Sequence, residues 1–219
     1  MLDNPRDFVI YNSQIVNQQI GESSPGMKIL FKASLPDAVH DSAAQEEASE
    51  FLPKTKHGEV LDELIPWSQQ PNTPFSVLWL IGPKSNLAHL ATRRVPESHI
   101  AASFFFPSAE GAQGGYQSAR RLFPTIAYQL ATHFPAYEAI LEAKLRRNRT
   151  LVSKSLQIQF RELITQPFEE LVEPEMFGRR RLIVVEGLEE SKSPHSRCEI
   201  IQILTTQTRG LPFRWLVQY

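Results

Sequence analysis

The stretch LWLIGPKSNLAHLATRR, Leu78 to Arg94, decides the fold of this chain. It begins inside the apolar run FSVLWLI, Phe75–Ile81, which is typical of a strand buried on both faces of a parallel sheet. A polar turn follows, and the pattern from Ser85 to Arg94 predicts a helix. A second apolar run, HIAASFFF at His99–Phe106, comes next, so we expect a strand–helix–strand unit with the right-handed crossover of parallel sheets.

The rest of the chain continues this alternation. Two further apolar runs predict strands at Arg181–Val185 and at Phe213–Tyr219. Between the second and third strands, apolar spacing typical of helices marks three segments, which are 118–134, 135–148 and 155–172. A last helix is expected from about Ser196 to Thr208. The sequence therefore predicts an α/β fold, with helices flanking a mostly parallel sheet of about four strands.

Three regions are expected along the chain. Residues 1–26 form a polar extension, in which DFVIYNSQIV, Asp7–Val16, has strong strand propensity. Residues 27–73 form a helical lead-in and linker. There we expect a short helix, then a polar linker, and then a helix that ends at Pro66. Residues 74–219 form the main domain.

Composition excludes several classes of protein. The chain has 219 residues, 42% of them apolar, and a net charge of -1. So balanced a charge argues against a nucleic-acid partner or an acidic membrane surface. The single cysteine, Cys198, excludes a disulfide framework and a zinc site built on thiolates. No apolar run approaches the roughly 20 residues that span a bilayer, and the polar N-terminus is unlike a signal peptide. We therefore expect a cytoplasmic protein.

The turn after the first strand holds part of a phosphate-binding pattern. In G-x-x-x-x-G-K-[ST], backbone amides surround a phosphate group, the lysine neutralises its charge, and the hydroxyl binds Mg²⁺. Here Gly82 and Pro83 lead directly into Lys84 and Ser85. Only one residue separates Gly82 from Lys84, and Pro83 has no N–H to donate. This spacing supplies too few amides to enclose a phosphate group.

The second half of such a site is an acidic group after a neighbouring strand. LIVVEGLEES places Glu186 at the end of the third strand, with Glu189 and Glu190 in the next turn. In an intact site the first carboxylate supports Mg²⁺ and a later one orients water. Acidic residues after apolar strands are also common in α/β folds generally, so this motif alone indicates a site only weakly.

Taken together, these segments resemble the NACHT-type P-loop NTPase module of fungal STAND proteins, which is also described as the nephrocystin-3-like N-terminal domain. The resemblance covers roughly Gly26 to Tyr219. It rests on motifs in the family's order: KASLPDAVHDSA, LDELIPW, LWLIGP, AASFFF, ARRLFPTIAYQLA, SKSLQIQFRELI, LIVVEGLEE and LPFRWLV. It implies a three-layer P-loop NTPase-like fold with strand order 5-1-4-3-2. It also identifies Lys84 and Ser85 with the family's lysine and serine.

The departures from the family pattern indicate a degenerate and C-terminally truncated member. The family reads G-P-x-G-x-G-K-S where this chain has Gly82-Pro83-Lys84-Ser85, so the glycine-rich arc is missing. The acidic motif D-x-L-D-E-C is replaced by residues 186–191, EGLEES. The chain ends at Tyr219, before the fifth strand and the sensor arginine that the family would place next. We therefore expect an NTPase-like module that does not hydrolyse nucleotide and that acts as a binding, regulatory or signalling-associated protein.

Three alternatives stay open at this stage. The chain could bind Mg-ATP or Mg-GTP through Gly82, Pro83, Lys84 and Ser85, with Ser85 and Glu186 as Mg²⁺ ligands. It could signal by templated β-assembly through residues 7–20, or it could be a truncated paralogue without selected activity. As partners we expect a second copy or related NACHT proteins. Loss of strand five would leave the first strand on an edge, which the Asp7–Val16 segment or a second copy would then cover.

Overall fold

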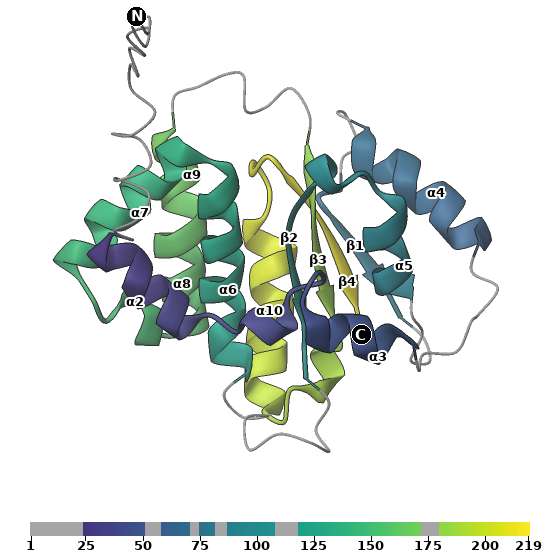
Figure 1. Cartoon of the computed structure of the whole chain (residues 1–219), viewed down its shortest axis with the longest axis horizontal. Helices are drawn as coiled ribbons and strands as arrows, with labels where there is room; N and C mark the ends of the chain where they lie inside the picture. The colour runs from purple at the N-terminus through teal and green to yellow at the C-terminus, as the bar shows by residue number, and fades with distance from the viewer. Residues whose placement is uncertain (1–23, 51–57, 71–74, 82–86, 108–117, 172–179) are drawn as a thin grey trace, which may run out of the picture.

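The computed structural model describes residues 24–50, 58–70, 75–81, 87–107, 118–171 and 180–219 (Figure 1). Four strands form one parallel sheet in the order β1-β4-β3-β2, and these strands are β1 Val77–Leu80, β2 Ile100–Phe105, β3 Arg181–Glu186 and β4 Phe213–Gln218. The predicted α/β fold with a four-stranded parallel sheet is confirmed. The order also agrees with the one that the family resemblance implies for these four strands. The expected N-terminal β segment lies outside the described residues.

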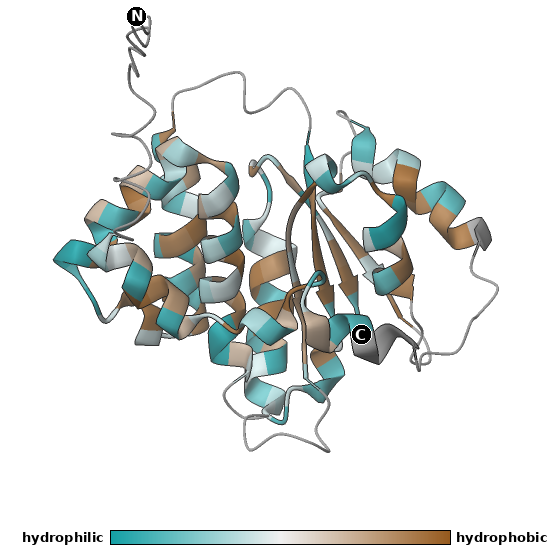
Figure 2. Ribbon diagram, viewed as in Figure 1, coloured by the Kyte–Doolittle hydropathy of each residue, from teal (hydrophilic) through white to brown (hydrophobic). Residues whose placement is uncertain are grey.

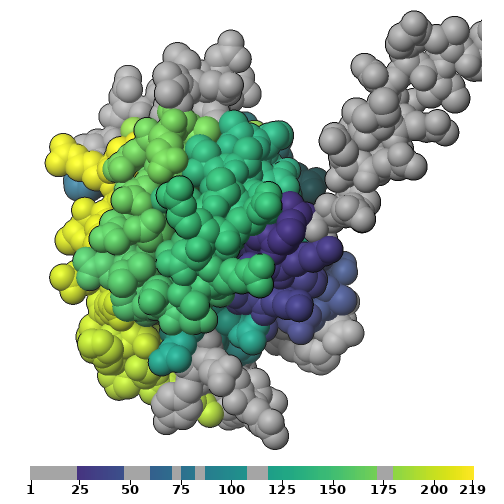
Figure 3. Space-filling model, turned by 90° about the vertical axis from the view of Figure 1, so that its left-hand side faces the viewer, coloured from purple at the N-terminus to yellow at the C-terminus, as the bar shows by residue number. Residues whose placement is uncertain are grey.

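Helices cover both faces of the sheet. One face carries the larger layer, made of α2 Pro25–Ala33, α6 Ser118–His133, α7 Pro135–Arg147, α8 Leu156–Phe160, the π-helical turn η4 Arg161–Thr165, α9 Gln166–Glu170 and α10 Pro194–Gln207. The other face carries α4 Gly58–Gln69 and α5 Leu87–Arg94. Figure 3 looks onto the larger layer, where the purple α2 lies against green helical residues far along the chain. No helix in the described ranges is both long and apolar enough to cross a bilayer.

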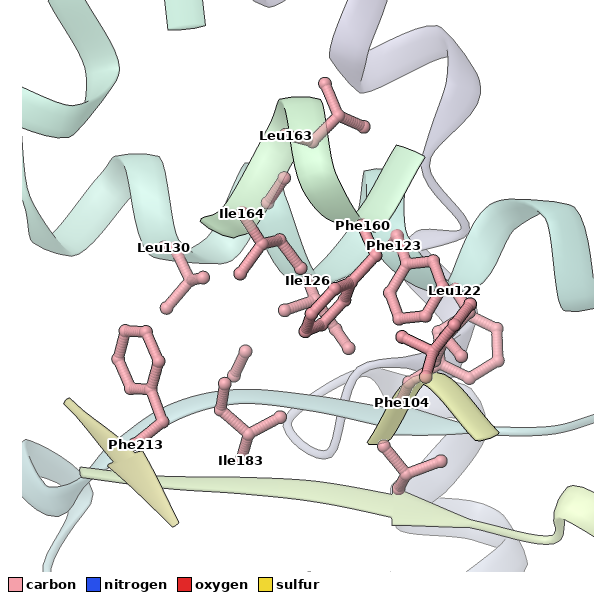
Figure 4. Close-up of a cluster of buried hydrophobic side chains, with 14 of the residues drawn as sticks. Phe104, Leu122, Phe123, Ile126, Leu130, Phe160, Leu163, Ile164, Ile183 and Phe213 are labelled. Carbon is pink, nitrogen blue, oxygen red and sulfur yellow. The ribbon is translucent and has the colours of Figure 1, made fainter. Parts of the chain in front are cut away.

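Alternate residues of each strand build the two cores. On β3, Ile183 and Val185 face the larger helical layer, whereas Leu182 and Val184 face α4 and α5. Figure 2 shows the strands as brown ribbons between helices of mixed hydropathy. In Figure 4 side chains from three strands point toward the helices of the larger layer, and the labelled residues are Phe104, Leu122, Phe123, Ile126, Leu130, Phe160, Leu163, Ile164, Ile183 and Phe213. This two-sided burial is why the strands read as continuous apolar runs.

The first strand departs from its predicted environment. We expected β1 to be buried on both faces, but all four of its residues are only partly buried. The reason is its place in the sheet, because β1 pairs with β4 on one side and with no described strand on the other. Phe75 and Ile81, which flank the strand, are 70% and 83% exposed.

Two predictions for the lead-in were wrong. Pro66 does not end its helix, since α4 continues to Gln69. The segment predicted as a polar linker contains a second helix, α3 Ala43–Glu50, after the short 3-10 turn η1 Pro36–Ala38. Ser42 begins this helix, because its carbonyl accepts from the amides of Gln45 and Glu46.

The long helix predicted over 155–172 contains a π-helical turn. The α-helical hydrogen-bond pattern is interrupted at Arg161–Thr165, just before Pro167. Proline cannot donate to the carbonyl four residues earlier, which belongs to Leu163. The buried Tyr137 hydroxyl donates to that carbonyl instead. A side chain of α7 thus satisfies the backbone group that Pro167 leaves without its usual donor.

Candidate functional site

The candidate site lies at the carboxyl edge of the sheet. All four strands are parallel, so their last residues meet there, namely Leu80, Phe105, Glu186 and Gln218. Helix α5 begins at the same edge, and the Ala88 amide donates to Gln218 Oε1 at 3.3 Å. This is the edge at which α/β proteins bind ligands, with helix N-termini directed at anionic groups.

Glu186 is the central acidic group of this edge. It is the last residue of β3 and lies opposite Phe105 in the register of the sheet. Its side chain is 16% exposed, and its Oε2 atom is buried without a hydrogen-bond partner. Burial raises the pKa of Glu186 to about 8, and the nearby charge of Glu189 contributes to that rise. The carboxyl group is therefore mostly protonated at neutral pH.

His89 in the first turn of α5 faces this carboxyl group. Its Nε2 atom lies 3.9 Å from Glu186 Oε2, and its ring packs on Phe105 with 4.3 Å between ring centroids. Burial lowers the pKa of His89 to about 4, with smaller contributions from Arg93 and His40. An ion pair would raise the pKa of His89 and lower the pKa of Glu186. Both shifts run the other way, so the loss of hydration on burial outweighs the attraction between the two groups.

The turn after Glu186 positions the other acidic residues. Gly187 adopts a left-handed conformation, with φ of 74°, and the 3-10 turn η6 Leu188–Glu190 follows it. A side chain is strained at such a φ, which explains the glycine between the strand and the acidic turn. The Oε2 atom of Glu189 and the Oγ atom of Ser191 are both buried without a hydrogen-bond partner. Three unpartnered oxygen atoms, including Glu186 Oε2, thus belong to this one strand-and-turn segment.

These unpartnered oxygen atoms are potential ligands for a divalent cation at this edge of the sheet. Mg²⁺ is usually held by one or two carboxylates together with waters and phosphate oxygens. Glu186 and Glu189 supply two carboxyl groups whose buried oxygens have no other partner, and this donor set fits such an ion. In the described part of the chain, no group of three or more His, Cys, Asp or Glu side chains is arranged to hold a metal without such additional ligands.

The predicted site residues divide into two sets. Glu186, Glu189 and Glu190 lie together at the end of β3, as the sequence indicated. The predicted nucleotide-binding residues, Gly82, Pro83, Lys84 and Ser85, lie outside the described residues. Their flanks are described, and they place this segment between the end of β1 and the start of α5.

Two residues of this edge were missed by sequence reasoning. His89 and Gln218 belong to no motif, and they reach the edge only because α5 and β4 are brought together by the fold. The signal for His89 was its place in the first turn of the helix that follows Lys84. The signal for Gln218 was a polar residue at the end of an apolar strand, and its side chain is only 6% exposed.

Comparison with known proteins gives one match. The family model described as Nephrocystin 3, N-terminal, matches residues 61–218, which include all four strands of the sheet and the whole carboxyl edge. No curated protein and no solved structure gives a match to this chain. Because the match covers most of the chain, the protein belongs to the nephrocystin 3 N-terminal family.

Proposed function

We propose that this chain is a NACHT-type NTPase-like module that does not hydrolyse nucleoside triphosphates and acts as a binding or regulatory protein. The family match supports the NACHT-type assignment. The observation that carries the loss of hydrolysis is the single residue between Gly82 and Lys84. A chain this short offers too few backbone amides to surround the β-phosphate, and Pro83 offers none.

The protonation of Glu186 at the carboxyl edge of the sheet also supports the loss of hydrolysis. Water activation and Mg²⁺ binding require ionised carboxylates. Burial raises the pKa of Glu186 to about 8, so at neutral pH a cation must displace a proton from this group in order to bind. Glu186 also stands where the family has the shorter aspartate, which shifts the position of the carboxyl group. Without hydrolysis, the role that we propose for this chain is to bind partner proteins, and related NACHT proteins are the expected partners.

A second function is favoured by one observation. The buried, unpartnered oxygens of Glu186 and Glu189 would be satisfied by a cation. In this alternative the chain binds Mg-ATP or Mg-GTP, with Lys84 on the phosphates and with Ser85 and Glu186 on Mg²⁺. The bound ion would neutralise phosphate charge, while Gln218 would hold the start of α5 through the Ala88 amide.

Thermal unfolding with and without Mg²⁺ and nucleotide separates the two functions. A ligand present at 100 times its dissociation constant stabilises the folded state by about 2.7 kcal/mol. We expect no change in melting temperature at millimolar ATP or GTP. A shift that is abolished by Lys84→Ala and by Glu186→Gln would establish nucleotide binding, and release of phosphate from ATP or GTP by the natural chain would overturn the loss of hydrolysis.

An insertion variant tests whether the missing glycine-rich arc is what prevents nucleotide binding. Inserting Ala-Gly-Thr-Gly between Pro83 and Lys84 restores the family pattern G-P-x-G-x-G-K-S. If the missing arc is what prevents binding, this variant should be stabilised by Mg-ATP or Mg-GTP while the natural chain is not. An insertion of four residues without glycine at the same point controls for loop length. Equal behaviour of both insertions would remove the missing arc as the explanation.

A further inference from the structure

The larger helical layer carries a groove made of two adjoining hollows, of about 520 Å³ and about 490 Å³. The first hollow has a small apolar floor on α7, formed by Ala139, Ile140 and Ala143. The second extends past the end of α7 to the 3-10 turn η3 Leu151–Ser153, to α8 and to the π-helical turn η4. Lys144, Arg147 and Glu170 line both hollows, so one elongated ligand can span them. We call this surface the α7 groove, and its layer faces the viewer in Figure 3.

The π-helical turn forms one wall of the α7 groove. Arg161 and Glu162, its first two residues, both line the second hollow. Turns of this kind are rare and are often found at functional sites. Lys144 Nζ lies 3.2 Å from Glu162 Oε2 and 3.6 Å from Glu170 Oε1, and Arg161 donates to Glu162 at 2.9 Å. The carboxylates among the described groove residues are therefore already paired.

Two further cations of the groove are not paired in this way. Arg147, the last residue of α7, and Lys154, which follows η3, both line the second hollow. Within the described ranges, neither side chain forms an ion pair. The described lining residues comprise four cations and two carboxylates, so the groove carries an excess of positive charge.

The backbone that carries Lys154 is fixed by a buried side chain. Gln159 is fully buried, and it donates to the Val152 carbonyl at 2.8 Å and to the Lys154 carbonyl at 3.1 Å. A cation in the last turn of a helix also complements the helix dipole, which accounts for Arg147. The dipole does not account for Lys154, which lies outside the helices and still lines the same hollow. The structure thus holds an unpaired cation at this place in the groove.

We propose that the α7 groove binds an acidic, partly apolar peptide segment of a partner protein. One carboxylate of that segment binds Arg147, whose guanidinium can donate two parallel N–H bonds, and a second carboxylate binds Lys154. An apolar side chain of the same segment packs on the floor of the first hollow. Clusters of basic side chains are a common means of recognising acidic motifs.

The mixed charge of the groove favours a peptide over other anionic partners. Glu162 and Glu170 lie among the cations, so a uniformly charged polyanion such as a nucleic acid would meet like charges there. A flat anionic bilayer would leave both hollows unfilled. A peptide can place carboxylates on Arg147 and Lys154 while its apolar and amide groups lie beside the two glutamates.

This inference rests on the proposed role in partner binding, and it adds the surface and the chemistry of the partner. It does not depend on the loss of nucleotide hydrolysis, because the lining residues belong to the outer helices and not to the carboxyl edge of the sheet. Phosphate release from ATP or GTP would refute the loss of hydrolysis and leave the groove untouched.

Selection from a random library of short peptides tests the groove, with the full chain as bait. We expect the enriched peptides to carry several aspartate or glutamate residues together with an apolar residue. Fluorescence anisotropy then measures the affinity of individual enriched peptides, and raising the salt concentration should weaken their binding.

Charge-reversal variants locate the site. Arg147→Glu with Lys154→Glu should weaken the binding of the enriched peptides about tenfold or more. Arg147→Gln with Lys154→Gln introduces no repulsion and should give a smaller loss in the same direction. Arg120→Glu with Arg209→Glu is the matched control, since it changes the net charge equally at exposed residues that do not line the groove. It should keep the affinity within about twofold, and unchanged melting temperatures show that the variants are folded.

Three outcomes would overturn the proposal. No enrichment, or enrichment of peptides without acidic residues, would remove an acidic peptide as the ligand. Acidic peptides whose binding survives Arg147→Glu with Lys154→Glu would place partner binding on another surface, while the proposed function would stand. Binding of heparin or of phosphatidylserine vesicles through these two residues, without peptide binding, would assign the groove to polyanions or membranes instead.

Discussion

His89 and Glu186 face each other across the carboxyl edge of the sheet, with 3.9 Å between Nε2 and Oε2. Burial lowers the pKa of His89 to about 4 and raises the pKa of Glu186 to about 8. Between about pH 4 and pH 8, both side chains are therefore mostly neutral. The two groups that face each other at this edge are therefore close to uncharged at neutral pH.

The first prediction follows from Glu186. Its folded-state pKa is raised from the ordinary value of 4.5 to about 8, so the stability that it contributes is complete below pH 4.5 and is lost as pH rises toward 8. His89 has a depressed folded-state pKa, so its contribution is complete above pH 6.5 and is lost as pH falls toward 4. Between pH 6.5 and 8 only Glu186 acts, and the free energy of unfolding should fall by about 2 kcal/mol.

Urea unfolding at a series of pH values measures this effect. Between pH 4.5 and 6.5 the contributions of Glu186 and His89 oppose each other, so their sum should be nearly level. His40 and His133, whose pKa values are also lowered by burial, should add stability as pH rises to 6.5. Glu186→Gln should remove the fall above pH 6.5, and His89→Asn should remove the opposing loss below it. If Glu186→Gln kept the same alkaline fall, the burial of this carboxyl group would not be its cause.

The second prediction concerns Tyr137 and Pro167. Burial raises the pKa of the Tyr137 hydroxyl well above 10, so it remains a proton donor, and it donates to the Leu163 carbonyl. Tyr137→Phe should leave that buried carbonyl without a donor and cost about 1–3 kcal/mol in the free energy of unfolding. Pro167→Ala restores an amide four residues after Leu163.

A double-mutant cycle by chemical denaturation tests the link. In the Pro167→Ala background, Tyr137→Phe should cost less than half as much, because the restored amide can donate to Leu163. The ring stacking of Tyr137 on Phe168 is kept in both backgrounds, so it cancels from the comparison. Equal costs in the two backgrounds would show that Pro167 is not the reason for the tyrosine hydroxyl.

The third prediction concerns Gly26 in the first turn of α2. Glu142 of α7 approaches this turn closely, and its Oε2 atom accepts from the Met27 amide at 3.0 Å. A methyl group on Gly26 would lie 2.5 Å from Glu142 Oε2 and 2.9 Å from the Glu142 carbonyl oxygen. Replacing a helical glycine by alanine usually stabilises a protein, but here Gly26→Ala should cost about 1–3 kcal/mol.

Thermal unfolding of Gly26→Ala, Glu142→Ala and the double variant would measure this contact. The two costs should add to more than the cost of the double variant, since removing the carboxylate relieves the closest contact with the new methyl group. A stabilised Gly26→Ala protein would contradict the close approach of α2 and α7.

The sequence predicted the sheet well because each strand carries its own local signal. After Arg181, the stretch Leu182–Val185 is apolar throughout and ends at an acidic turn, and the structure places the strand and Glu186 as expected. What local pattern could not show was position within the sheet. FSVLWLI reads like a central strand, yet β1 lies on the edge of the described sheet, as only the family resemblance had implied, because a strand's neighbour is determined by contacts distant in sequence.

The residues of the candidate site, like the strands, could be predicted where they carry a local sequence signal. Glu186 and Glu189 were predicted from their place at the end of an apolar strand, and the structure places them at and just after the end of β3. His89 was not, because its role depends on how α5 packs against the end of β3 rather than on any spacing near His89. Pro66 was misread as the end of a helix that continues to Gln69. Pro167 was overlooked because the Tyr137 hydroxyl of a neighbouring helix donates to the carbonyl that this proline leaves without a donor.

The last prediction concerns Arg214, a fully buried residue of β4. Its guanidinium group donates to the Gln70 carbonyl at 2.8 Å and to the Phe75 carbonyl at 2.9 Å. It thereby holds the end of the α4 region and the entrance of β1 against the sheet. Arg214→Met keeps most of the side-chain volume but leaves both carbonyls without this donor, so it should cost about 2–4 kcal/mol in the free energy of unfolding.

Arg214→Lys should cost less than Arg214→Met but should not restore full stability, because a single ammonium group cannot reproduce the fork of a guanidinium. Arg180→Met is the matched control, since it removes a nearby positive charge that, after burial, contributes to lowering the pKa of Arg214. That variant should change stability by no more than about 0.5 kcal/mol. Urea unfolding of the three variants checks the order, and an Arg214→Met protein as stable as the natural chain would show that the two carbonyls do not depend on this side chain.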